Sequence, residues 1–268
     1  MRTRLNNCDI FYTSQGSGPP IVLLHGFPLN HTIWEPQVEE LSRDFQVVTP
    51  DLRGHGESEA TPGIYGMDLF AQDLKALIDH LRIERVILGG LSMGGYVAFA
   101  FLKQFGERVQ ALILADTKAE ADTAEAQARR EQQAQEALQN GAGPIADRLI
   151  LTMLTPESRE GNKALTGQVY EMMKLTDPVG VAGSLRGMAQ RPDSTPLLSS
   201  LRIPTLILVG EKDSTTPLID AQKMAASIGG SELVIVPRSA HLTSLENPKN
   251  VNVAVRRFLE RTRPQLTA

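Results

Sequence analysis

Short apolar runs alternate with segments of helical periodicity along most of this chain. The runs are bounded by turn residues and cover residues 21–24, 45–49, 85–88, 111–114, 205–209 and 233–236. Between several of them apolar residues recur at helical spacing, as at Leu69, Leu74, Leu77, Ile78 and Leu81. Parallel strands need long crossover connections, so this alternation predicts an α/β fold with a mostly parallel sheet. The runs lack an in-out alternation, which indicates strands covered by helices on both faces.

The strand pattern stops between residues 118 and 199. Helical patterns replace it at residues 119–139, 145–154, 157–175 and 179–189. We expect residues 118–199 to form a helical insertion between two strands, with residues 1–117 and 200–268 forming one core domain. The first of these helices is mostly polar with small alanines, which is typical of a solvated helix that rests on its neighbours.

Composition and charge exclude several classes of protein. The 268 residues are 41% hydrophobic and 22% charged, as in ordinary globular proteins. The 27 basic and 31 acidic residues sum to −4, so no basic surplus is present to bind a nucleic acid. Cys8 is the single cysteine and cannot form an internal disulfide, and no Cys/His cluster has the spacing of a zinc site.

The chain has no apolar stretch suited to a membrane. The residues at its amino terminus contain no apolar run long enough for a signal peptide. The longest apolar runs, such as residues 205–209, have about five residues, whereas a spanning helix needs about twenty. We therefore expect a soluble cytoplasmic protein with neither a membrane nor a nucleic acid as partner.

The segment Gly90-Leu91-Ser92-Met93-Gly94 lies between a predicted strand and a predicted helix over residues 95–105. A serine flanked by glycines in this strand–turn–helix context is typical of a nucleophile elbow. Glycines lack a Cβ atom, so strand and helix can pack closely around a strained serine. No Lys-Ser or Lys-Thr follows, as a phosphate-binding loop requires. The pattern predicts Ser92 as a nucleophile.

An acid and a histidine follow Ser92 in the order that this elbow requires. Asp213 comes four residues after the predicted strand 205–209, and His241 comes five residues after the strand 233–236. Ligand sites of open α/β sheets form at these carboxyl ends. We predict His241 as the base and Asp213 as the acid, with Asp116 and Glu211 as competitors for the role of acid.

The remaining histidines have structural interpretations. His80 lies at the end of a predicted helix, His31 in a loop, and His55 in a glycine-flanked turn. His25 precedes Gly26 in a loop after a strand, where we expect a structural side chain. Asp51, which follows another strand near Arg53, is expected to form a structural ion pair or a turn hydrogen bond.

Acyl transfer needs hydrogen-bond donors directed at the developing negative charge of the substrate oxygen. In an elbow of this type one donor is the backbone N–H of the residue after the nucleophile, here Met93, and the other comes from the loop after an earlier strand. That loop contains His25-Gly26-Phe27-Pro28. We predict an oxyanion hole formed by the backbone N–H groups of Phe27 and Met93.

Four blocks of sequence together resemble the α/β-hydrolase superfamily. They are residues 25–28, residues 51–58 (Asp-Leu-Arg-Gly-His-Gly-Glu-Ser), the Ser92 elbow, and residues 210–213 with His241. Within the superfamily the chain resembles bacterial carboxylesterases and the related enol-lactonase and haloperoxidase-like (perhydrolase) subgroups. The resemblance implies an eight-stranded sheet whose second strand is antiparallel, a helical cap made by residues 118–199, and no cofactor or metal.

The same resemblance separates the chain from neighbouring groups. Dehalogenases and epoxide hydrolases of this fold have an aspartate at the elbow, where this chain has Ser92. Haloperoxidase-like members usually have phenylalanine before the serine, where this chain has Leu91.

We expect a serine hydrolase that cleaves small carboxylic esters through an acyl-enzyme. The alternatives are a lactonase acting on N-acyl homoserine lactones or enol-lactones, a perhydrolase-like side activity, and a small-molecule receptor that retains the triad. Five apolar residues of the expected cap suit either an apolar entrance or core packing: Met153, Leu154, Met172, Met173 and Met188.

Overall fold

Eight strands form one sheet in the computed structural model, which describes residues 1–266. The spatial order is β1-β2-β4-β3-β5-β6-β7-β8. Strand β2 is antiparallel to β1 and β4, and all other neighbouring pairs are parallel. The bounds are β1 (Arg2–Leu5), β2 (Cys8–Gln15), β3 (Pro20–Leu24), β4 (Gln46–Pro50), β5 (Val86–Leu91), β6 (Val109–Ala115), β7 (Thr205–Gly210) and β8 (Glu232–Val236). The predicted α/β class and the eight-stranded sheet are confirmed.

The apolar runs predicted β3 to β8 within a few residues, whereas β1 and β2 gave no such run. Along β2 buried residues alternate with partly exposed ones from Cys8 to Tyr12. A strand with one exposed face carries polar side chains at every second position, so no continuous apolar run marks it.

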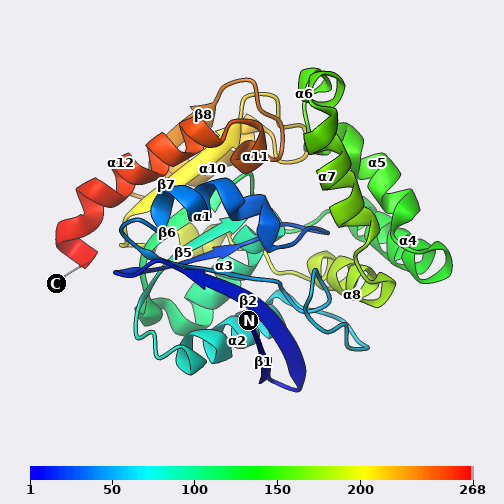
Figure 1. Ribbon diagram of the computed structural model, residues 1–268, viewed down its shortest axis with the longest axis horizontal. Coiled ribbons are helices and arrows are strands. Elements are labelled where there is room, and N and C mark those ends of the chain that lie inside the picture. Colours follow the sequence, from blue (N-terminus) through cyan, green and yellow to red (C-terminus); the bar gives the residue numbers. More distant parts are fainter. Residues whose placement is uncertain (267–268) are drawn as a thin grey trace.

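Helices cover both faces of the sheet (Figure 1). Helices α2 (Met67–His80), α3 (Met93–Phe105) and α10 (Leu218–Ser227) pack on one face, and α1 (Glu35–Leu41) and α12 (Pro248–Leu266) on the other. Successive residues of β3 point alternately into the two cores, with Val22 and Leu24 in one, and Ile21 and Leu23 in the other. Short elements complete this part: η1 (His31–Trp34), η2 (Gly106–Arg108) and α11 (Thr243–Glu246).

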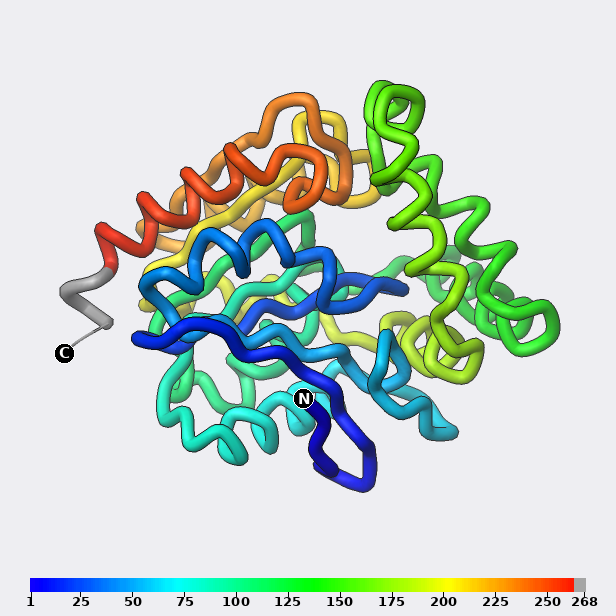
Figure 2. The backbone as a smooth tube through the Cα atoms, in the orientation of Figure 1, coloured from blue at the N-terminus to red at the C-terminus, as the bar shows by residue number. Residues whose placement is uncertain are grey.

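Only helices lie between β6 and β7, and they extend to one side of the sheet in Figure 1. We call α4 to α9 the helical segment. Its members are α4 (Ala124–Asn140), α5 (Gly143–Met153), α6 (Pro156–Gly161), α7 (Lys163–Lys174), α8 (Pro178–Ala189) and α9 (Thr195–Leu198). Figure 2 shows the backbone leaving the sheet for this segment and returning to β7.

Two helices of this segment differ from the sequence expectation. The pattern at residues 157–175 is not one helix, because Asn162 leaves the helical conformation (φ −126°, ψ 77°) and separates α6 from α7. Its side-chain oxygen accepts a hydrogen bond from the backbone N–H of Leu165 and so begins α7. Helix α4 begins at Ala124 rather than at residue 119. Thr123 is its N-cap, and the side chain of Thr123 accepts a hydrogen bond from the backbone N–H of Ala126.

Over residues 1–266 no helix combines the length and the apolar character needed to cross a membrane.

Candidate active site

Ser92 occupies the turn between β5 and α3 in a strained conformation, with φ 52° and ψ −113°. Its backbone N–H donates to Ala115 O at 2.9 Å, and the hydroxyl of Thr117 donates to its carbonyl at 2.8 Å. Ala115 is the last residue of β6 and Thr117 lies two residues beyond it, so the neighbouring strand and the loop that follows it hold the turn in place. Ser92 is partly exposed, whereas its neighbours Leu91 and Met93 are buried.

The glycines of the turn allow strand and helix to come together around Ser92. A Cβ atom on Gly90 would lie 2.3 Å from the backbone of Gly94, and one on Gly94 would lie 2.4 Å from the carbonyl oxygen of Leu24. No side chain fits at such distances. The close packing of β5, β3 and the start of α3 therefore depends on these two positions.

Asp213 and His241 meet at the carboxyl ends of β7 and β8. His241 Nδ1 lies 2.8 Å from Asp213 Oδ2, and the two residues are 1% and 6% exposed. The other hydrogen bonds of the carboxylate come from the backbone N–H groups of Thr215 and Thr216 and from the hydroxyl of Thr216. The pKa of Asp213 lies below its ordinary value, so its carboxylate is ionised and accepts from Nδ1 of His241, which carries the proton. In the neutral ring Nε2 is then the nitrogen that can accept a proton.

The environment adjusts the pKa values of this pair in opposite directions. Burial disfavours the charged form of His241, but the neighbouring Asp213 and Asp116 outweigh it and raise the pKa of the imidazole above its ordinary value. Burial likewise opposes the ionisation of Asp213, but His241 and the bonds from Thr216 keep the pKa of this carboxyl below its ordinary value.

Asp116 accepts hydrogen bonds from residues near Asp213 and near His241, and it does not bond to His241 itself. Its Oδ1 accepts from the backbone N–H of Gly210 at 2.9 Å, and its Oδ2 accepts from the hydroxyl of Thr243 at 2.6 Å. Burial, together with the charge of Asp213, raises the pKa of Asp116 to about 8. Glu211, the other competitor, accepts a hydrogen bond from the backbone N–H of Arg238 and lies exposed. Of the three candidate acids, Asp213 is the one bonded to His241.

The loop after β3 lies against Ser92. A Cβ atom on Gly26 would be 3.2 Å from the Cβ atom of Ser92. Phe27 follows directly and is buried, and its ring lies nearly perpendicular to that of His55, with the ring centres 6.2 Å apart. Within residues 1–266, the backbone N–H groups of Phe27 and Met93 have no hydrogen-bond acceptor. Two free donors next to a strained serine suit an oxyanion hole.

Of the other histidines, His25 and His31 connect the segment after β3 to the segment after β4. His25 Nδ1 bonds to Gly26 O at 2.8 Å, and its Nε2 accepts from Leu52 N at 2.9 Å. His31 Nδ1 lies 2.8 Å from Asp51 Oδ1. His55 bonds to the carbonyl of Arg53, and burial lowers its pKa to about 3.

Asp51 also forms the expected turn bond, since its Oδ2 accepts from the backbone N–H of Glu57 at 2.8 Å. Arg53 is paired with Asp73 rather than with Asp51, through two bonds of 2.9 and 2.8 Å. In the part of the chain that the structure describes, no group of three or more His, Cys, Asp or Glu side chains is placed to hold a metal ion.

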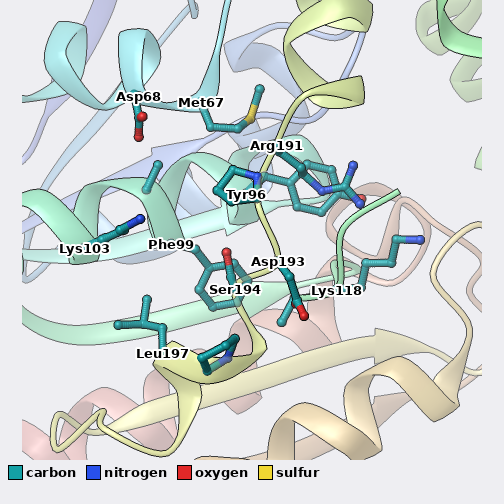
Figure 3. Close-up of a pocket in the computed structure, with 14 residues that line it drawn as sticks. Met67, Asp68, Tyr96, Phe99, Lys103, Lys118, Arg191, Asp193, Ser194 and Leu197 are labelled. Atoms are coloured by element: carbon teal, nitrogen blue, oxygen red, sulfur yellow. The ribbon is translucent and has the colours of Figure 1, made fainter. Parts of the chain in front are cut away.

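A cavity of about 390 Å³ lies between α2, α3 and the chain that returns from the helical segment. Figure 3 shows Arg191 beside Tyr96. The guanidinium lies 4.0 Å from the centre of the Tyr96 ring, and it forms a 2.8 Å ion pair with Asp122. Tyr96 is one helical turn after Ser92. The chain between α8 and α9 is thus in contact with α3, the helix that follows Ser92.

Sequence reasoning missed the hydrogen bonds of Thr216 with Asp213 and those of Glu246 with Thr155 and Ala240. The run Asp213-Ser214-Thr215-Thr216 contains a usable signal, because an aspartate often accepts hydrogen bonds from backbone N–H groups two and three residues later. Glu246 gave no such local signal, since its partner Thr155 is 91 residues away in the chain. The five apolar residues at positions 153, 154, 172, 173 and 188 are all buried in the two cores.

Comparisons with known proteins agree with this fold. Residues 19–248 match the model of the family described as alpha/beta hydrolase fold. A thermophilic esterase from Thermogutta terrifontis has a TM-score of 0.94 and 40% sequence identity, covering 97% of this chain and 96% of the esterase.

Lactonases are also among the similar proteins. The enol-lactonase from Burkholderia xenovorans has a TM-score of 0.91 and 26% identity, with 97% and 100% of the two chains covered. The 3-oxoadipate enol-lactonase 2 of Acinetobacter baylyi is 29% identical, with 92% of this chain and 91% of the lactonase covered.

The fold and the residues at the strand ends therefore define a protein of the hydrolase class. The chain belongs to the α/β-hydrolase fold family, and it resembles the family's esterases and enol-lactonases.

Proposed function

We propose that the protein is a carboxylesterase that cleaves small carboxylic esters through an acyl-enzyme formed on Ser92. The observation that carries the proposal is the combination of a strained, partly exposed Ser92 with a buried hydrogen bond between His241 and Asp213. The similarity to the Thermogutta esterase at 40% identity supports an ester substrate.

In this mechanism Nε2 of His241 accepts the proton of the Ser92 hydroxyl as the oxygen attacks the ester carbonyl. Asp213 stabilises the imidazolium that forms, and the N–H groups of Phe27 and Met93 bind the developing oxyanion. His241 then protonates the leaving alcohol. Water attacks the acyl-enzyme with the same histidine as base, which releases the carboxylic acid and restores Ser92.

We also propose that residues 118–199 act as a cap over Ser92. The hydroxyl of Thr176 donates to Pro28 O at 2.9 Å, and the backbone N–H of Asn30 lies 3.3 Å from the sulfur of Met172. The backbone N–H of Leu242 donates to Met153 O at 3.1 Å. The segment thus contacts the loop that contains Phe27 and the loop that contains His241. These contacts support a site in which only a small acyl group fits.

Lactone hydrolysis is the second candidate, favoured by the similarity to two enol-lactonases. Ring opening by the same residues differs only in that the leaving alcohol stays attached to the acyl group. A comparison of kcat/KM for nitrophenyl esters, N-acyl homoserine lactones and an enol-lactone separates the two. A lactone hydrolysed a hundredfold faster than every ester would assign the protein to the lactonases.

The proposal is tested by turnover of nitrophenyl acetate or butyrate by the wild type and by Ser92→Ala. We expect many turnovers by the wild type and a loss of about 10⁴-fold or more in kcat for the variant. An active-site phosphonate should add its mass to the peptide containing Ser92 alone. A reaction that stops after one acylation would indicate a receptor, and a variant that keeps more than a few per cent of the activity would exclude Ser92 as nucleophile.

A further inference from the structure

The loop that carries His241 is bound to the helical segment through Glu246. Oε2 of Glu246 accepts the backbone N–H of Ala240 at 2.6 Å. Oε1 accepts the backbone N–H of Thr155 at 2.8 Å and the Thr155 hydroxyl at 2.9 Å. One carboxylate therefore joins the residue before His241 to the junction between α5 and α6.

A second hydrogen bond holds the other side of His241. The backbone N–H of Leu242 donates to Met153 O at 3.1 Å. Met153 and Thr155 are each 2% exposed, so this junction is packed against the core and does not project into solvent. The residues immediately before and after His241 are thus both bonded, directly or through Glu246, to residues 153–155.

On the core side, Asp116 accepts the hydroxyl and the backbone N–H of Thr243. The position of the imidazole relative to Ser92 is set by the backbone between these attachments, because the hydrogen bond to Asp213 fixes the orientation of the ring but not the position of the loop.

We propose that Glu246 is a positioning residue, which holds the His241 loop in register with Ser92 by binding it to the helical segment. The proposal rests on the proposed function, since it takes His241 as the base. Its consequence is that the placement of α5 and α6 is coupled to the reactivity of the serine through the side chain of Glu246, in addition to the direct bond from Leu242 to Met153.

The chemistry at this position requires a carboxylate. Glu246 receives three donors, from Ala240 N–H, Thr155 N–H and the Thr155 hydroxyl, and an ionised carboxylate presents only acceptors. Glutamine has the same shape, but its NH₂ group must face either the N–H of Ala240 or the N–H of Thr155. One side of the link then breaks while the volume of the side chain is kept.

The test compares Glu246→Gln with Glu157→Gln. Glu157 pairs with Lys212 across the surface between α6 and the Asp213 loop, and both side chains are substantially exposed. A small displacement of a catalytic group can reduce turnover by about 100-fold, so we expect Glu246→Gln to lower kcat about tenfold or more with little change in KM. Glu157→Gln should retain wild-type kcat, because it contacts no backbone group beside His241.

A matched pair at Thr155 examines the same link from the other side. Thr155→Val removes the hydroxyl donor and should lower kcat, as Glu246→Gln does. Thr155→Ser keeps the donor and should have a kcat close to that of the wild type. Thermal unfolding of each variant gives the temperature range in which all of them are folded, and kcat is compared within that range.

A readout without substrate separates this inference from the proposed function. The proton on Nδ1 of His241 should give a downfield NMR resonance, assigned by its absence in His241→Ala. We expect faster solvent exchange and a shift of this resonance in Glu246→Gln, but not in Glu157→Gln. If the wild type hydrolysed neither esters nor lactones, the proposed function would fail, and the resonance would still decide whether Glu246 positions the ring.

The inference would be overturned if folded Glu246→Gln had the resonance and the kcat of the wild type. If the unfolding temperature of that variant were also lower, Glu246 would be a residue that only stabilises the fold.

Discussion

Oδ2 of Asp213 lies 2.8 Å from Nδ1 of His241, although the two residues are 28 positions apart and belong to loops after different strands. The same carboxylate accepts three hydrogen bonds from Thr215 and Thr216. These bonds hold the carboxylate in a fixed orientation, and the carboxylate in turn holds the imidazole in the tautomer that leaves Nε2 available as a base.

Replacing Asp213 with asparagine should lower kcat far more than replacing Asp116. Asparagine at position 213 presents an NH₂ group or a neutral oxygen to Nδ1, so the tautomer and the stabilisation of the imidazolium are lost, at a cost of about 10⁴-fold. Asp116→Asn keeps an acceptor for Gly210 N–H and should cost much less. The comparison is made with kcat on one nitrophenyl ester, and a larger loss in Asp116→Asn would move the role of acid to Asp116.

Activity should fall on the acidic side through a single ionisation that lies above the ordinary pKa of histidine. His241 must be neutral to accept the serine proton, and its pKa is raised by Asp213 against the effect of burial. A raised pKa keeps the ring charged to a higher pH, so the loss begins at a higher pH than for an unperturbed histidine. The profile of kcat/KM from pH 5 to 9 measures this limb, and a flat profile would contradict a histidine base. His31→Asn serves as the control. His31 bonds to Asp51 and not to Asp213 or His241, so the acidic limb of kcat/KM should be the same as in the wild type.

The stability of the protein should depend on pH through Asp116. Burial and the charge of Asp213 raise the pKa of this carboxyl from 3.8 to about 8, so between these values the folded chain binds a proton that the unfolded chain releases. The contribution of Asp116 to the free energy of unfolding is therefore present at low pH and decreases as the pH rises toward 8. The asparagine of Asp116→Asn cannot ionise, so the free energy of unfolding of this variant should not show the decrease that Asp116 causes in the wild type.

The measurement is the difference in unfolding temperature between the wild type and Asp116→Asn, recorded at several values from pH 4 to 9. We expect the wild type to lose stability relative to the variant as the pH rises. A difference that stays constant over this range would show that Asp116 has an ordinary pKa.

Gly94→Ala should damage both the fold and the activity, whereas Gly106→Ala should do neither. A Cβ atom on Gly94 would lie 2.4 Å from the backbone oxygen of Leu24, so β3 and α3 must move apart. Overpacking of this kind typically costs about 1–3 kcal/mol. At Gly106, at the end of the same helix, a Cβ atom meets nothing within 4 Å. Urea unfolding of both variants tests the difference, and equal stabilities would refute the close approach at Gly94.

Short acyl chains should be preferred among the ester substrates. If residues 118–199 cover Ser92, the acyl site is limited, and nitrophenyl esters of about two to six acyl carbons should have the highest kcat/KM. A series from acetate to laurate tests this. A maximum at about twelve carbons or more is what an interfacial lipase with a broad apolar rim would give instead.

The order of elements and the chemical character of the site follow from local sequence patterns. Buried parallel strands leave continuous apolar runs, and the elbow leaves its glycines around Ser92, because at these positions only particular residues fit the backbone. The loops after β7 and β8 were predicted to carry an acid and a base because ligand sites of open α/β sheets form at the carboxyl ends of the strands. The half-exposed strands β1 and β2 were not found from apolar runs, since one of their faces is polar.

The sequence favoured Asp213 as the acid but left Asp116 and Glu211 as competitors, because all three follow strands. The tertiary structure decided which of them contacts His241. The structure bonds Asp213 to the imidazole, places Asp116 between Gly210 and Thr243, and turns Glu211 toward Arg238. Likewise, the contact between Glu246 and Thr155 joins residues 91 positions apart. Such contacts depend on how separate elements pack, and no local pattern of residues records that packing.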